Sequence, residues 1–135
     1  MERFLKAHQS DYLRALSEVR AGEKTSHWMW YIFPQLRGLG FSEMARYYGI
    51  AGEKEAAEYM SEPTLRAHML ELCEALLKLE TNDARAVFGD IDAKKLRSSM
   101  TLFTETAPEY DVFSRVLQKF YGGKEDPKTL ELLGK

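Results

Sequence analysis

The feature that most constrains the fold is a long amphipathic segment in the middle of the chain, from Pro63 to about Glu80. Its apolar side chains recur at the helical spacings of three and four, and proline at its start suits the first turn of a helix. The apolar arc is wide, which predicts a central helix with neighbours on several sides. The stripe consists of Leu65, Met69, Leu72, Leu76 and Leu79, widened by Leu70, Cys73 and Leu77.

Glycine and proline divide the rest of the chain into short segments, and no window alternates apolar and polar residues as a strand does. We therefore predict an all-α fold, a single domain over residues 1–135 with about seven or eight short helices around the central helix. The expected N-caps are Ser10 or Asp11, Thr25 or Ser26, Ser42, Asp83, Asp92 and Asp126. The expected helical segments are 2–8, 11–22, 27–33, 42–48, 54–60, 63–80, 92–107, 110–121 and 127–133, and Asp83 is expected to cap a short turn that ends at 88–89.

Composition excludes several classes of protein. Hydrophobic residues make up 44% and charged residues 30% of the chain, a balance that argues against disorder. The 19 basic and 21 acidic residues form no clustered basic face, so we expect no duplex nucleic acid as partner. The N-terminus has no apolar signal segment, and no stretch approaches the ~20 apolar residues of a membrane span. With Cys73 as its only cysteine, the chain is expected to be cytoplasmic and to have no membrane partner.

The most unusual segment runs from His27 to Phe33 and holds two tryptophans, a tyrosine and a phenylalanine. One interpretation is a platform on which Trp28 or Trp30 stacks against a planar ligand, with His27 as the candidate acid or base. The other is a core cluster whose indole N–H groups find partners inside the protein. The pattern leaves both open.

The second unusual segment is a polar cluster at residues 94–99. Arg97 can clamp a phosphate or carboxylate through two parallel hydrogen bonds, and Lys95 and Ser98 lie three residues apart on one helix face. An ordinary contact between helices explains the same residues. The three histidines are scattered and Cys73 falls on an apolar face, so we expect no metal site. The glycine pair at 38 and 40 lacks the third glycine of a dinucleotide motif, and no cofactor is expected.

Two strings, residues 26–36 and 95–103, carry a resemblance to a known family. From about Phe4 to Leu133, the chain resembles the small bacterial family named domain of unknown function 1810, whose members are sometimes mislabelled calpastatin. The resemblance implies an all-helical fold of one domain and no known activity. It also implies that both strings are family signatures, whose polar members are Ser26, His27, Gln35, Lys95, Arg97, Ser98 and Ser99.

Two hypotheses for the function follow. In the first, the two signature strings form a cleft that binds a small anionic or nucleotide-like ligand, with or without catalysis. The proposed binding residues are Trp28, Trp30, Gln35, Lys95, Arg97 and Ser98. In the second, the chain is a protein-interaction or self-association module without catalytic activity, and the aromatic segment or the loop from Gln35 to Phe41 is the contact surface. The sequence leaves open the ligand, any reaction, and whether the protein is a monomer or a homodimer.

Overall fold

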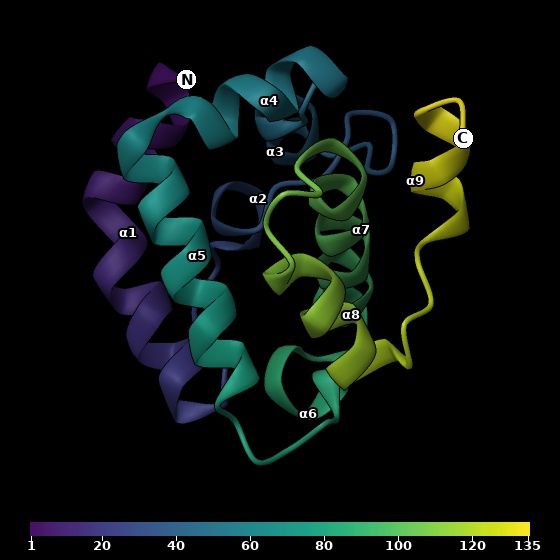
Figure 1. The fold of residues 1–135 in the computed structure, drawn as a ribbon. Helices are drawn as coiled ribbons and strands as arrows, with labels where there is room; N and C mark the ends of the chain where they lie inside the picture. Colours follow the sequence, from purple (N-terminus) through teal and green to yellow (C-terminus); the bar gives the residue numbers. More distant parts are fainter.

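The computed structural model describes residues 1–135 and contains nine helices and no strand (Figure 1). This confirms the predicted all-α fold. Nine helices agree with the expected seven or eight around a central one, because the two segments expected before residue 22 form one helix and the expected turn at 83–88 forms α6. The elements are α1 (Glu2–Ala21), α2 (Met29–Ile32), α3 (Glu43–Tyr48), α4 (Glu53–Ser61), α5 (Pro63–Leu77), α6 (Ala84–Phe88), α7 (Asp90–Thr106), α8 (Val112–Tyr121) and α9 (Pro127–Leu132).

Two helices share the centre of the fold. The predicted central helix, α5, packs against α1, α4 and α8, and α7 packs against α4, α6, α8 and α9. Leu76 of α5 and Leu96 and Phe103 of α7 have no exposed surface. The Cys73 thiol of α5 reaches the Met100 sulfur of α7 at 3.8 Å. The core therefore lies between these two helices, with α1 outside α5 and α9 outside α7 (Figure 1).

The first helix differs from its prediction. Instead of a short helix and a new one capped at Ser10 or Asp11, α1 runs without a break to Ala21. Its buried residues explain this, because they continue the helical stripe on both sides of the expected break. They are Phe4, His8, Tyr12, Ala15, Leu16 and Val19. The helix ends as predicted at Gly22, which adopts the left-handed conformation that glycine accepts without strain.

Three predicted caps are confirmed and three are wrong, one of them the cap at Ser10 or Asp11 inside α1. Ser42, Asp83 and Asp126 each accept a hydrogen bond from a backbone N–H in the first turn of α3, α6 and α9. Asp92 caps nothing, because α7 already begins at Asp90. The expected cap at Thr25 or Ser26 is also absent, since α2 begins only at Met29 and has no side-chain cap.

His8 of α1 lies in the core and holds α2 and α5 together. Its Nε2 donates to the Tyr31 carbonyl oxygen at 2.8 Å, and its Nδ1 is 2.9 Å from Nδ1 of His68 on α5. A carbonyl oxygen only accepts, so the neutral ring carries its hydrogen on Nε2, and the hydrogen shared with His68 comes from His68. Tyr12 stacks on His68 with ring centres 3.5 Å apart and donates to Glu71. Each ring of this group thus has a defined hydrogen-bonding role.

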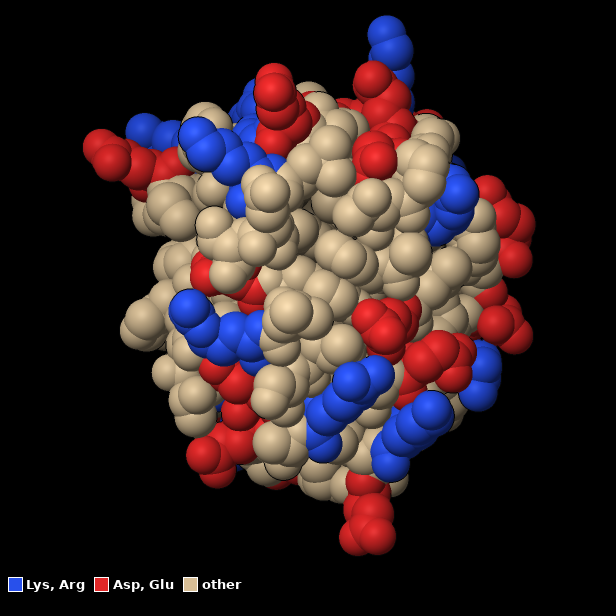
Figure 2. Space-filling view, turned by 90° about the vertical axis from the view of Figure 1, so that its left-hand side faces the viewer, with Lys and Arg blue, Asp and Glu red and all other residues tan.

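On the face over α1, Lys and Arg side chains are mixed with Asp and Glu around an uncharged centre (Figure 2). A protein that binds duplex DNA needs a continuous basic surface, and this face has none. None of the helices combines the length and the apolar character that spanning a membrane requires.

We predict that the protein loses stability as the pH falls from 6.5 towards 4. Burial lowers the pKa of His8 to about 4, and burial also lowers the pKa of His68. In this range the unfolded chain binds a proton at His8 and the folded chain does not, so unfolding becomes easier. At pH 4.5 the expected loss is about 2–3 kcal/mol relative to pH 7.

Urea unfolding of the wild type and of His8→Gln at both pH values measures this contribution. The glutamine amide retains a donor for the Tyr31 carbonyl but does not titrate, so the variant should lose less stability on acidification. An equal loss in the two proteins would contradict the assignment to His8.

Candidate functional site

The first signature string is anchored by a carboxylate that the sequence analysis did not identify. Glu18 of α1 accepts hydrogen bonds from the backbone N–H groups of Thr25 and Ser26 at 2.7 and 2.9 Å. It also accepts from the Ser26 hydroxyl at 2.6 Å and from the indole N–H of Trp28 at 3.0 Å. Burial opposes ionisation of Glu18, but these hydrogen bonds outweigh it and lower the pKa to about 2. Glu18 therefore holds the loop between α1 and α2 in place.

Trp28 is a core residue. It has no exposed surface, its indole N–H is taken by Glu18, and the Lys24 ammonium lies 4.9 Å from its ring centre. Lys24 in turn pairs with Asp92 of α7 at 2.9 Å. The predicted role of Trp28 as a stacking surface for a ligand does not fit this position, whereas the alternative interpretation of a core tryptophan with an internal partner does.

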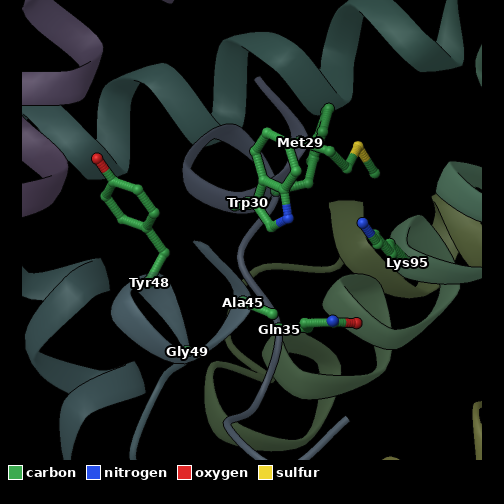
Figure 3. A pocket seen from close by; sticks show the side chains of 8 residues that line it. Met29, Trp30, Gln35, Ala45, Tyr48, Gly49 and Lys95 are labelled. Atoms are coloured by element: carbon green, nitrogen blue, oxygen red, sulfur yellow. The ribbon is translucent and has the colours of Figure 1, made fainter. Parts of the chain in front are cut away.

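Trp30, two residues later, lies at the surface and lines a narrow cleft that we call the Trp30–Lys95 cleft (Figure 3). Its walls come from α2, from the loop after Pro34, from the end of α3 and from α7. The cavity volume of about 10 Å³ is room for roughly one water molecule. The lining residues are Met29, Trp30, Phe33, Gln35, Ala45, Tyr48, Gly49 and Lys95.

Three polar side chains from different segments converge on this cleft. The Lys95 ammonium lies 5.2 Å from the Trp30 ring centre, within the range of a cation–π interaction. The same ammonium is 3.6 Å from Asp92, one turn earlier on α7. The Trp30 indole N–H and the Gln35 amide form no hydrogen bond within the chain, and the indole nitrogen and Lys95 point into the same space beside Gln35 (Figure 3). The cleft thus presents several N–H donors at one place.

The backbone beside the cleft depends on a close approach at Gly49. The N–H of Arg37 donates to the Ile50 carbonyl at 2.8 Å, and the N–H of Ile50 donates to the Gln35 carbonyl at 2.9 Å. A Cβ atom at Gly49 would lie 2.8 Å from the Arg37 Cα and 2.9 Å from the Ala45 carbonyl oxygen. Only glycine fits at this position, and the contact fixes Gln35 against the end of α3.

Arg97 and Ser98 point away from the cleft and hold the C-terminal segment. The Arg97 guanidinium donates to the carbonyl oxygens of Lys124 and Glu125 at 2.8 and 2.7 Å. The buried Ser98 hydroxyl is 3.1 Å from the Asp126 carboxylate, which also caps α9. Of the second signature string, only Lys95 therefore meets Trp30 and Gln35, and the predicted single cleft is formed by fewer residues than expected. Arg97 instead borders a separate groove of about 460 Å³ between α6, α7 and α8.

His27 does not line the cleft. Its side chain is exposed and forms no hydrogen bond, and its carbonyl oxygen accepts one from the Tyr31 hydroxyl at 3.3 Å. A general base needs a partner that orients it and a substrate position within reach, and neither lies beside His27. No three His, Cys, Asp or Glu side chains gather closely enough to hold a metal ion.

The whole chain resembles proteins that are known by family and fold. The family model described as "Protein of unknown function (DUF1810)" matches residues 1–133. The chain is also similar to the crystal structure of a conserved hypothetical protein from Mycobacterium tuberculosis, determined at 1.38 Å. That match has 40% sequence identity and a TM-score of 0.96, and it covers 99% of this chain and 96% of that chain. No curated protein matches the chain.

We predict that Glu18→Ala destabilises the protein by about 2–4 kcal/mol, because it leaves the buried Trp28 indole and two backbone N–H groups without an acceptor. The matched control is Glu23→Ala, since Glu23 is exposed and forms no ion pair. Urea unfolding of both variants measures the difference. Equal stabilities would show that Glu18 is not the anchor of this loop.

We also predict that Arg97→Ala loosens the C-terminal segment and lowers the stability by about 2 kcal/mol, since two charge-assisted hydrogen bonds are lost. Amide hydrogen exchange should accelerate in residues 124–133 and remain unchanged in α5. Arg85→Ala, at an exposed arginine on α6, is the control and should leave exchange in that segment unchanged. Unaltered exchange in Arg97→Ala would contradict the clamp.

Proposed function

This chain belongs to the DUF1810 family of proteins of unknown function, and from the geometry of the Trp30–Lys95 cleft we propose that it binds a small anionic ligand there. The observation that carries the proposal is the convergence of N–H donors, of which the Trp30 indole and the Gln35 amide have no partner in the chain and Lys95 is paired only with Asp92. The Trp30 indole, the Gln35 amide and the Lys95 ammonium come from three segments and face one space. N–H donors beside a cation suit a carboxylate or phosphate oxygen.

The size of the cleft narrows the class of ligand. Space for about one water molecule admits an anionic head group at the mouth and excludes a whole nucleotide. Lys95 already covers part of the Trp30 ring, so we expect a ligand to bind through its oxygens rather than by stacking. For a nucleotide-like ligand, the base and sugar would lie outside the cleft.

The proposal is for binding, and it assigns no catalytic step. His27, the candidate acid or base, is not among the residues that line the cleft, and the Cys73 thiol is fully buried, which raises its pKa. We further propose that the protein works in the bacterial cytoplasm. The unpaired, buried Cys73 suits a reducing compartment, and the similar protein of known structure is bacterial.

The alternative function, a protein-interaction module, receives no support from the aromatic segment itself. Trp28, Met29, Ile32 and Phe33 are buried. Residues in this position pack the core and are not accessible to a partner. Phe41, at the end of the following loop, is the exposed aromatic residue of the region.

A thermal-shift screen of carboxylates, inorganic phosphate, sugar phosphates and nucleotides tests the proposal. A ligand at 100 times its dissociation constant adds about 2.7 kcal/mol of stability, which is a readily measured shift in Tm. The variant Lys95→Ala should lose this stabilisation. The matched control is Lys94→Ala, whose exposed lysine lines the separate groove near Arg97.

Stabilisation that persists in Lys95→Ala, or that is lost equally in Lys94→Ala, would overturn the assignment to the cleft. Absence of a shift with every class of anion would overturn the proposed function.

A further inference from the structure

The helix α3 and the loop before it expose the largest apolar side chains that lie close together in the sequence. Phe41 is 75% exposed, Met44 38% and Tyr47 59%. They recur every three residues, and no residue of α3 is buried. Single exposed apolar residues are normal on a protein surface, but a cluster on one helix marks a site of contact. We call these three side chains the α3 patch.

A groove between α1 and α3 adjoins the α3 patch. Its volume is about 430 Å³, and Met44 and Tyr47 form one of its walls. The opposite wall is the face of α1 that carries Lys6 and Ser10, and the Tyr31 and Tyr48 side chains also line it. A ridge of apolar side chains beside a groove is the shape that two helix faces need in order to interlock.

The backbone at the end of α3, below the exposed patch, is anchored to α1. Arg3 of α1 donates from Nε to the Tyr47 carbonyl oxygen at 2.8 Å and from Nη2 to the Gly49 carbonyl oxygen at 3.3 Å. Its guanidinium is fixed in turn by Glu55 of α4 at 3.1 Å. The Tyr48 ring packs 5.7 Å from Phe4 of the core. A backbone anchored in this way loses little conformational entropy when a partner binds.

Beside the ion-paired Arg3 and Asp11, the surroundings of the patch contain two charges of opposite sign that have no ion-pair partner. Lys6 lies in the α1 wall of the groove, and Glu43 lies in the first turn of α3 beside the patch. Neither side chain takes part in an ion pair within the chain. Under a two-fold rotation, Lys6 of one copy can face Glu43 of the other at both ends of the contact. This self-complementarity favours a second copy of the same chain as the partner.

We propose that the protein forms a symmetric homodimer in which the α3 patch of each copy occupies the α1–α3 groove of the other, with Lys6 of each copy paired to Glu43 of its partner. The interface is separate from the donors of the Trp30–Lys95 cleft. Tyr48 lines both the cleft and the groove, but the test changes no donor of the cleft, so dimerisation is measured independently of ligand binding.

Sedimentation equilibrium of the full chain over a wide range of concentrations tests the proposal. We expect the mass of the wild type to rise from 15.6 kDa towards that of a dimer. Tyr47→Asp, Lys6→Glu and Glu43→Lys should each weaken dimerisation at least about tenfold. The double variant Lys6→Glu/Glu43→Lys restores the opposite charges across the two-fold axis and should regain most of the affinity.

The matched control is Ile91→Asp, at a residue of α7 that is 72% exposed and lies outside the patch. It should dimerise like the wild type, and circular dichroism confirms that each variant is folded. A wild type that stays monomeric at all concentrations would overturn the proposal. So would a dimer that persists in Tyr47→Asp, or a double variant as weak as the single ones.

Discussion

The Glu18 carboxylate is the interaction on which the N-terminal half of the structure depends. Four hydrogen bonds converge on this one side chain, from two backbone N–H groups, a hydroxyl and an indole. The loop that leads from α1 to the buried Trp28 is half-exposed, and the side of a helix supplies an acceptor for its backbone donors. Fixing the loop fixes Trp28, and Trp28 fixes the direction in which α2 leaves the core. With Trp28 buried in the core, Trp30 lies two residues further along and lines the cleft.

The polar residues of the two signature strings serve two distinct purposes. Ser26, Arg97 and Ser98 bind other parts of the same chain, and their hydrogen bonds connect segments that no apolar contact would orient. Gln35 and Lys95 keep donors directed into the Trp30–Lys95 cleft. Ser26, Arg97 and Ser98 thus have hydrogen-bond partners inside the chain. In the proposed function, a ligand oxygen would accept hydrogen bonds from Gln35 and Lys95.

The fold was largely predictable because capping side chains and glycine mark many helix ends in the sequence itself. Ser42, Asp126 and Gly22 mark ends through their own side chains or backbone conformation, and these predictions are confirmed. The predicted break at Ser10 is wrong, because the apolar stripe of α1 continues past this possible cap. The site was predictable only in part. Glu18 looks like any glutamate on the polar side of a helix, so nothing in the sequence distinguishes it.

Arg97 illustrates the same limit, because its partners are backbone carbonyls that carry no sequence signal. Its pairing with the C-terminal segment depends on where the chain turns after α8. Trp30, Gln35 and Lys95, three of the six proposed binding residues, line one cleft, and their role in binding stays a prediction.

The contact between the buried His8 and the half-buried His68 has a consequence for how the protein takes up protons. If one proton is added, His8 can donate through Nδ1 to Nδ1 of His68, whose own hydrogen then moves to Nε2, and the contact between the rings survives. A second proton would place two N–H groups head to head at 2.9 Å. The two rings therefore titrate as a single unit with a capacity of one proton, and the Tyr31 carbonyl stays bonded in both of its states. The contact between the two rings thus survives the first protonation, which burial opposes, and is broken by a second.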